Sequence, residues 1–365
     1  MRHLLLIMIL SFALSGTGIA TVSDSLKYVN ATEFPLIGKG FADTQNRYER
    51  LPVRLKGKTR PAVWSLSKNC AGLAIRFRTN SPVIGAKWEL TGNVTMSHFA
   101  PTGVKGLDLY CLKNGKWQFV NVARPSGKTN KTVIINHMEG TDMEYMLYLP
   151  LYDGLVNLEI GVDSTATIGN PQVDSPRKDK PVVFYGTSTT QGGCASRAGM
   201  SYPNLLSRML DRQIINLGFS GNGQLDLEVA EVMAEIDASC FVIDCISNVT
   251  EEQMNEKYIR FLEIIREKRP DVPVLLVENN HFPHMYFDQT IFALVQQKNE
   301  TLKRIYAEQK KKGDSNIYYL KSDKLIGNDF EPTVDGAHLT DLGFLRMAEN
   351  MYPVIRKLIN STLTD

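Results

Sequence analysis

One serine, one histidine and one aspartate have the types and spacing that nucleophilic acyl transfer requires. Asp335 and His338 lie three residues apart in the sequence Asp-Gly-Ala-His. At this spacing the carboxylate can accept a hydrogen bond from one imidazole nitrogen while the other nitrogen stays free to take a proton. Ser188 lies in a segment of small and hydroxyl residues that follows an apolar run. We therefore predict that Ser188 attacks an ester carbonyl, with His338 as its base and Asp335 orienting His338.

The oxyanion that this attack creates needs hydrogen-bond donors, and two further segments contain candidates. Gly221 offers a backbone N–H with no side chain in the way, and Asn248 offers a side-chain amide. Together with the N–H of Ser188 they form the predicted oxyanion hole, in which each donor lowers the barrier by about 2–4 kcal/mol. Both residues also have a structural interpretation, because Gly221 could relieve a turn and Asn248 could cap the acidic helix start at 250–252.

The second half of the sequence contains the elements that would bring these residues together. Strand-like apolar runs cover 181–185, 213–217, 240–245, 272–277 and 317–320. Helical patterns cover 202–210, 225–236, 252–268, 289–311 and 341–358. This alternation predicts an α/β domain over 181–365, with a five-stranded parallel sheet between layers of helices. The carboxyl ends of parallel strands meet at one edge of the sheet, and we expect the site there.

The first half has a different pattern. Short strand signals without long helical periodicity fill residues 21–165, and turn signals such as Asn114-Gly115 separate them. This pattern predicts an all-β sandwich of the jelly-roll kind. Residues 166–180 are rich in Pro, Gly, Asp, Ser and Lys, and we interpret them as a linker between two domains.

The four segments that carry the predicted chemistry also resemble a known family. Ser188, Gly221, Asn248 and the Asp335/His338 pair follow the order of the four blocks of SGNH (GDSL-type) hydrolases, and the resemblance spans 181–358. It implies a flavodoxin-like, three-layer α/β/α fold. It also implies an esterase that uses a Ser-His-Asp triad without a metal or an organic cofactor.

Two positions depart from the pattern of that family. Thr187 stands where many members have Asp, and Ile246 stands where many have Gly. We expect Thr187 to leave the role of the nucleophile intact. We expect Ile246 to narrow the site or to shift Asn248.

A second, shorter motif lies in the first half. Residues 106–110 read Gly-Leu-Asp-Leu-Tyr and resemble the Gly-x-Asp-Leu-Tyr signature of a β-sandwich that precedes such hydrolase domains in some exported bacterial esterases. Within this stretch, Asp108 and Tyr110 are candidates for the interface between the domains, as is His98. Strand packing is the alternative explanation for all three.

Other polar residues near the predicted strand ends are weaker candidates. Glu278 and His281 follow the fourth strand, and we predict that they line the substrate pocket. Zinc binding by His281 and His284 is the alternative, but Pro283 lies between them and breaks the helix that would align them. Cys194 lies six residues beyond Ser188 without a partner base in the sequence, so we interpret it as an inert or pocket-lining thiol.

The N-terminus predicts export. Residues 1–20 contain the charged, apolar and small-residue regions of a secretory signal, and we expect cleavage after Ala20. A membrane anchor is the alternative, but the apolar run from Leu4 to Leu14 is much shorter than the roughly 20 residues that span a bilayer. A glycan at the Asn248 acceptor sequence would block the site. We therefore expect a bacterial protein of the periplasm or the extracellular space, without stable membrane insertion.

The five cysteines are too few for a dense disulfide framework in a chain of this length. A bridge between Cys70 and Cys111 is one option, because both lie in the sandwich. Cys240 and Cys245 lie in one apolar run, and we expect them in the core.

Composition narrows the functional classes. The 41 basic and 39 acidic residues give a net charge of only +2, which argues against nucleic acid as a partner. The leading hypothesis is an exported serine esterase that removes small acyl groups, above all acetyl, from carbohydrate. Other hypotheses are a lysophospholipase, a thioesterase, a peptidoglycan O-acetyl esterase or a non-catalytic glycan-binding protein. The sequence leaves the oligomeric state open.

Overall fold

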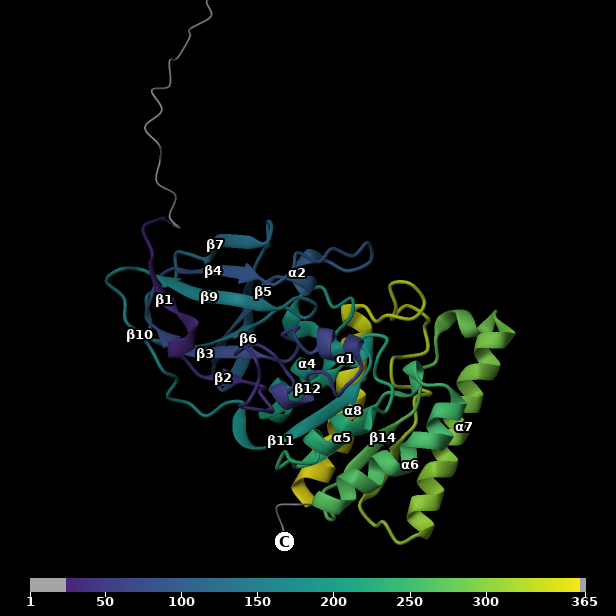
Figure 1. Cartoon of the computed structure of the whole chain (residues 1–365). Helices are drawn as coiled ribbons and strands as arrows, with labels where there is room; N and C mark the ends of the chain where they lie inside the picture. The colour runs from purple at the N-terminus through teal and green to yellow at the C-terminus, as the bar shows by residue number, and fades with distance from the viewer. Residues whose placement is uncertain (1–23, 362–365) are drawn as a thin grey trace, which may run out of the picture.

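The chain folds into an antiparallel β-sandwich followed by an α/β half, in a computed structural model that describes residues 24–361 (Figure 1). The predicted signal peptide, residues 1–20, lies outside the described residues. Within 24–361, no helix has both the length and the apolar character needed to cross a membrane. The predicted fold class, a sandwich followed by a three-layer α/β/α domain, is confirmed.

Two antiparallel sheets form the sandwich. One sheet contains, in spatial order, β1 (Lys27–Asn30), β9 (Leu155–Val162), β4 (Ile84–Leu90) and β7 (Thr129–Ile135). The other contains β10 (Ile168–Gly169), β3 (Ala74–Thr79), β8 (Met143–Tyr148), β5 (Leu107–Lys113) and β6 (Lys116–Ala123), with β2 (Leu36–Ile37) paired to β3. Short helical turns connect these strands: η2 (Ala31–Glu33), η3 (Val53–Leu55), α1 (Pro61–Leu66) and α2 (Pro101–Val104). Inward-facing side chains such as Trp88, Leu109 and Leu147 fill the space between the sheets.

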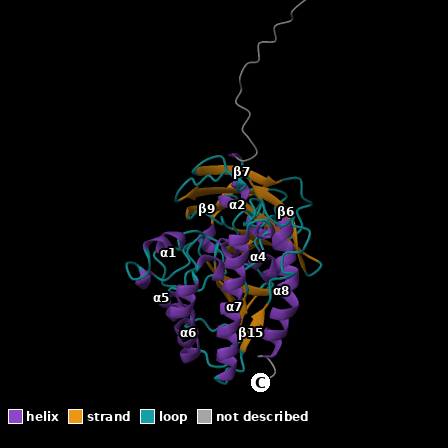
Figure 2. Cartoon of the chain, turned by 90° about the vertical axis from the view of Figure 1, so that its right-hand side faces the viewer, coloured by secondary structure: helices purple, strands orange, loops and turns teal. Residues whose placement is uncertain are grey.

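The α/β half is built on a five-stranded sheet in which all strands are parallel. Its spatial order is β12 (Arg212–Gly218), β11 (Arg177–Gly186), β13 (Cys240–Asp244), β14 (Val274–Val277) and β15 (Ile317–Leu320). Helices α4 (Tyr202–Leu210) and α8 (Asp341–Ser361) cover one face, and α5 (Leu227–Met233), α6 (Glu251–Lys268) and α7 (Gln289–Lys311) cover the other. Figure 2 shows α5 and α6 on one side of the molecule and α8 on the other.

Alternation along the central strand explains the two helix layers. Val182 and Phe184 of β11 pack in the core cluster of α4 and α8, whereas Val183 and Tyr185 pack in the cluster of α5 and α6. All four side chains are fully buried, as expected for a parallel strand covered on both faces. The strand starts at Arg177, inside the predicted linker, because Arg177 already pairs with Arg212 of the neighbouring strand β12.

The sandwich and the α/β half share one apolar core. Tyr148 and Leu151 from the sandwich region lie in the same buried cluster as Ala198 and Tyr202. The segment 41–63, which precedes β3, packs against the opposite face of the α/β half. A contact of this kind ties the orientation of one half to that of the other.

The cysteines are free thiols, so the option of a Cys70–Cys111 bridge is wrong. Cys70 packs beside Leu155, while Cys111 on β5 pairs with Tyr145 of β8. Cys240 and Cys245 are buried in the core, as expected.

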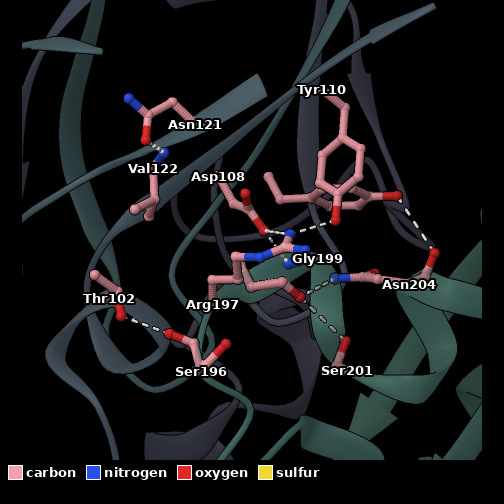
Figure 3. A network of polar contacts seen from close by, with 12 residues as sticks. Thr102, Asp108, Tyr110, Asn121, Val122, Ser196, Arg197, Gly199, Ser201 and Asn204 are labelled. Atoms are coloured by element: carbon pink, nitrogen blue, oxygen red, sulfur yellow. Dashed lines mark hydrogen bonds and ion pairs between the residues drawn. The ribbon is translucent and has the colours of Figure 1, made fainter. Parts of the chain in front are cut away.

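The Gly-Leu-Asp-Leu-Tyr motif on β5 faces two cores at once. Leu107 and Leu109 point into the sandwich, whereas the alternate residues Asp108 and Tyr110 point toward the α/β half. Asp108 Oδ2 accepts hydrogen bonds of 2.8 Å from Gly199 N and from Arg197 Nη1, which also donates to the Tyr110 hydroxyl (Figure 3). A Cβ on Gly199 would lie 2.5 Å from the Tyr110 hydroxyl and 2.7 Å from Asp108 Oδ2. Only glycine fits there, so the motif clamps the segment around η4 (Ala198–Met200).

We predict that Arg197→Met destabilises the protein by about 3–5 kcal/mol, because the Asp108 carboxylate is fully buried and would lose its only cationic hydrogen-bond donor. Arg177→Met is the matched control, since Arg177 and Asp211 form an exposed pair with an N–O distance of 3.7 Å and such pairs contribute roughly 0–1 kcal/mol. Denaturant unfolding of both variants measures the difference. Equal losses would contradict the role assigned to Asp108.

Candidate active site

Ser188 lies at the start of a four-residue helix directly after the central strand. Helix α3 (Ser188–Gln191) follows β11, and the Thr187 hydroxyl accepts a hydrogen bond of 3.3 Å from the Thr189 N–H. Thr187 thus caps the helix, a task for which Ser, Thr, Asp and Asn are all suited. A Cβ on Gly186 would lie 2.5 Å from the Asp244 carbonyl oxygen, so the turn into the helix leaves room only for glycine.

Asp335 and His338 form a close pair in a tight turn before α8. The His338 Nδ1 atom lies 2.8 Å from Asp335 Oδ2, and Asp335 Oδ1 accepts from the N–H groups of Ala337 at 3.0 Å and His338 at 2.8 Å. Burial raises the pKa of Asp335, but the hydrogen bonds from His338 and Ala337 outweigh it and lower the pKa to about 2. The carboxylate is therefore ionised at neutral pH and can hold the imidazole in one orientation.

The loop after Ser188 reaches the histidine turn. Cys194 Sγ and a ring nitrogen of His338 lie within 4.8 Å of each other. The side chain of Asp341, the first residue of α8, accepts hydrogen bonds from the N–H and hydroxyl of Ser196. Among the hydrogen bonds of residues 24–361, none joins Ser188 Oγ to His338. Catalytic hydrogen bonds are often long in free enzymes and tighten when substrate binds.

Gly221 lies in a loop that packs on the nucleophile turn. Its φ of +66° is in the left-handed region that favours glycine, it is exposed, and its N–H donates to no acceptor among the described residues. Neighbouring contacts hold the loop, because Phe219 N donates to Gly186 O at 3.0 Å and Ser220 N donates to the Gln191 side chain at 2.9 Å. The geometry places an unused donor next to the Ser188 turn.

Two arginines from the first half support this loop, and the sequence analysis missed both. Arg50 is buried and donates to the carbonyls of Asn216 at 3.0 Å and Gly218 at 2.7 Å. Arg60 donates to the Asn222 carbonyl at 2.8 Å and pairs with Asp226. Neither arginine belongs to a short motif, so only the three-dimensional contact reveals them.

Asn248 ends the turn η5 (Ile246–Asn248) after β13. The cap of α6 is Thr250, which forms a capping box with Gln253, so the helix-cap interpretation of Asn248 is wrong. The Asn248 Oδ1 atom is buried and accepts no hydrogen bond. Ile246 packs in the hydrophobic core cluster of α6. The expectation that this side chain narrows the site is therefore wrong.

For the two residues after β14, Glu278 and His281, a role in lining the substrate pocket stays a prediction. The Glu278 carboxylate accepts from the Tyr319 hydroxyl at 2.5 Å and from Ser322 N at 2.9 Å, contacts that tie together the ends of β14 and β15. His281 lines a narrow cleft with Ser322 and Phe330. His284, in η6 (Pro283–Tyr286), instead reaches the histidine turn, with its Nδ1 atom 3.1 Å from the Gly336 carbonyl oxygen.

A side chain of the sandwich also reaches the site. His98 lies in the turn between Met96 and Phe99, and the centre of its ring is 5.4 Å from the ring centre of His338. Tyr152 contributes a hydroxyl 3.4 Å from the Ser188 carbonyl oxygen. The candidate site therefore lies where the two halves meet.

A buried acid lies beneath the nucleophile turn. Asp244 Oδ2 accepts from the Tyr202 hydroxyl at 2.8 Å and from Thr190 Oγ1 at 3.2 Å. Burial raises its pKa to about 7, and the two hydrogen bonds oppose this shift only in part. The folded protein thus holds a proton on Asp244 that the unfolded chain releases near pH 4.

We predict that Asp244→Asn removes a pH-dependent loss of stability. Between about pH 4 and 7 the folded state binds more protons than the unfolded state, so the stability of the wild type falls as pH rises. The stability of the variant relative to wild type should rise by about 2–3 kcal/mol between about pH 5 and about pH 8. Denaturant unfolding at both pH values measures this, with the exposed Asp237→Asn as control. An equal effect at both values would contradict the raised pKa.

Family comparisons agree with this architecture. The model of the GDSL-like lipase/acylhydrolase family matches residues 179–356, and the model of the N-terminus of SGNH hydrolase-type esterases, named after Gly-x-Asp-Leu-Tyr, matches residues 26–168. Among functionally curated proteins, none matches the chain significantly.

Three solved structures share this fold, and the first of them also supports the family. A protein from Bacteroides ovatus ATCC 8483, described as a GDSL-like lipase, is 40% identical, with a TM-score of 0.88 over 92% of this chain and 98% of that one. A salicylyl acyltransferase from a tetracycline biosynthetic pathway is 17% identical, with a TM-score of 0.72 over 92% and 98% of the two chains. A family two carbohydrate esterase from Cellvibrio japonicus is 12% identical, with a TM-score of 0.61 over 92% and 98%. The chain therefore belongs to the GDSL-like lipase/acylhydrolase family and carries the Gly-x-Asp-Leu-Tyr domain of SGNH-type esterases in front of its hydrolase domain.

Proposed function

We propose that this protein is an exported serine esterase that removes small acyl groups, above all acetyl, from carbohydrate. The observation that carries the proposal is the Asp335–His338 pair, held in a turn next to the loop that follows Ser188. Family membership supports ester hydrolysis, and the sequence of residues 1–20 supports export.

In the proposed mechanism, His338 Nε2 takes the proton of the Ser188 hydroxyl as the oxygen attacks the ester carbonyl. Asp335 remains ionised and stabilises the imidazolium that forms. The oxyanion accepts hydrogen bonds from the N–H groups of Ser188 and Gly221 and from the Asn248 amide. His338 then protonates the leaving alcohol, and a water molecule releases the acid from Ser188 by the same steps in reverse.

The surroundings of the histidine turn support a carbohydrate substrate. Tyr286, Phe287 and Phe330 are exposed large side chains on neighbouring loops, and Phe287 is 91% exposed. The rings of Tyr286 and Phe330 pack edge to face at 5.1 Å, and His284 of the same turn contacts Gly336. Exposed aromatic rings offer an apolar face beside polar edges, which suits the mixed surface of a sugar ring. The shared fold of the Cellvibrio japonicus carbohydrate esterase agrees with this choice.

The same exposed rings also support a second candidate function, an esterase for lipid or long-chain acyl substrates. An exposed apolar patch is also a place where an acyl chain or a lipid surface can bind. The chain-length preference separates the two candidates, because a site for acetylated sugar prefers p-nitrophenyl acetate and acetylated xylan. A lysophospholipase or a thioesterase for long acyl chains prefers the octanoate ester.

We predict that Ser188→Ala and His338→Ala each lower kcat for p-nitrophenyl acetate by at least about 10³-fold. The first variant lacks the nucleophile, and the second lacks the base that takes the proton of the nucleophile. Asp335→Asn should lower kcat by about 10²–10⁴-fold, since the imidazole loses its carboxylate partner. Acetate release and circular dichroism of each folded variant measure these effects. Full turnover by Ser188→Ala would overturn the mechanism, and no turnover by the wild type on any ester would favour the glycan-binding protein.

We predict that Phe287→Ala raises KM for acetylated xylan about threefold to tenfold and leaves kcat/KM for p-nitrophenyl acetate unchanged, because the small ester does not reach the exposed ring. The exposed Val156→Ala, on the sandwich strand β9, is the control for loss of an exposed apolar side chain away from the site. An equal loss on both substrates would mean that Phe287 supports the fold of the loop and does not bind the glycan.

A further inference from the structure

Three metal-ligating side chains from separate parts of the chain meet at the predicted catalytic base. They are His98, Cys194 and His338, and their ligand atoms all lie within 4.8 Å of one another. Among residues 24–361, no other group of three His, Cys, Asp or Glu side chains has this geometry. Two imidazoles and a thiolate form a ligand set that Zn²⁺ prefers.

Each ligand is positioned by its own contacts. His98 lies in the turn closed by the Met96–Phe99 bridge, at the edge of the sandwich. Cys194 follows Gly192 and Gly193 in the loop after α3 and is only 7% exposed. In His338, the Nδ1 atom is occupied by Asp335, so the nitrogen left for a ligand bond is Nε2.

We propose that His98, Cys194 and His338 form a site for Zn²⁺, and that occupation of this site switches the esterase off. A metal ion on His338 Nε2 removes the nitrogen that would accept the proton of Ser188. Binding of the ion depends only on the three side chains, whereas the inhibition rests on the proposed function.

The distances suit a site that closes on its ion. Zinc–nitrogen and zinc–sulfur bonds of about 2.0–2.3 Å in a tetrahedral arrangement place two nitrogens and one sulfur about 3.3–3.6 Å apart. Since no pair of ligand atoms is more than 4.8 Å apart, the largest closure needed is roughly 1 Å, which small χ rotations of the three side chains achieve. Three protein ligands leave the fourth position to water, and the thiol proton of Cys194 passes to solvent on binding.

The position of Cys194 has no explanation in ester hydrolysis. Its φ of +74° is unusual for a residue other than glycine. The two residues before it are glycines, yet the cysteine itself also adopts a left-handed conformation. This conformation is less favourable for a residue with a side chain than for glycine. The backbone thus presents a buried sulfur to two imidazoles that are half-buried and reachable from solvent.

The first test measures binding without activity. Ser188→Ala is titrated with Co²⁺, which takes zinc sites and reports a thiolate ligand by a charge-transfer band in the near ultraviolet. We expect one Co²⁺ per chain, displaced by Zn²⁺, and a dissociation constant raised at least about tenfold by adding His98→Gln or Cys194→Ser. Cys111→Ser and His137→Gln, both in a separate pocket of the sandwich, are the matched controls and should leave binding unchanged.

The second test measures inhibition of p-nitrophenyl acetate hydrolysis by Zn²⁺, with Mg²⁺ as the hard cation that a His/Cys set disfavours. Cys194→Ser should keep most of the basal rate. Both Cys194→Ser and His98→Gln should raise the Zn²⁺ concentration that halves each variant's own rate at least about tenfold. Absence of the cobalt band, or a band and inhibition that neither variant changes, would overturn the site. A wild type that binds Co²⁺ through Cys194 but hydrolyses no ester would keep the site and refute the proposed function instead.

Discussion

The buried carboxylate of Asp108 is the contact that joins the two halves at the level of the site. It accepts from Gly199 and Arg197 and so fixes the segment that follows the predicted nucleophile helix. In the same segment, Ser196 donates a hydrogen bond to Asp341 at the start of α8. The turn of His338 lies directly before that helix, so the segment also positions this turn. One fully buried charge therefore sets the distance between the loop of Ser188 and the turn of His338. The second half alone lacks this constraint.

The first half contributes to the site as well as to the fold. Arg50 and Arg60 hold the loop of Gly221 through carbonyl groups, Tyr152 approaches the Ser188 carbonyl, and His98 approaches His338. These contacts explain physically why a Gly-x-Asp-Leu-Tyr sandwich accompanies a hydrolase domain in this chain. We infer that the first half is part of the active-site scaffold, since its residues contact three of the four segments that carry the predicted chemistry, those of Ser188, Gly221 and His338.

The sequence predicted what depends on period and local chemistry. Strand and helix alternation after residue 181 gave the parallel sheet, and the Asp-x-x-His spacing gave the pair that the structure shows at 2.8 Å. It did not predict the arginine contacts, because a buried guanidinium that binds carbonyls leaves no pattern in the chain. It did not predict the contact between His284 and the turn of His338, because spacing cannot say which of two histidines faces that turn. For Ile246 it predicted either a narrower site or a shifted Asn248, and the burial of that side chain in the core contradicts the first alternative.

The central claim is that Ser188 is the nucleophile of a serine esterase, and covalent labelling tests it most directly. The wild type, Ser188→Ala and Cys194→Ser are incubated with a fluorophosphonate, and intact mass and peptide mapping locate the adduct. We predict one phosphonyl group per chain, on Ser188, present in the wild type and in Cys194→Ser but absent from Ser188→Ala. Labelling that persists in Ser188→Ala, or that falls on another residue of the wild type, would contradict the account.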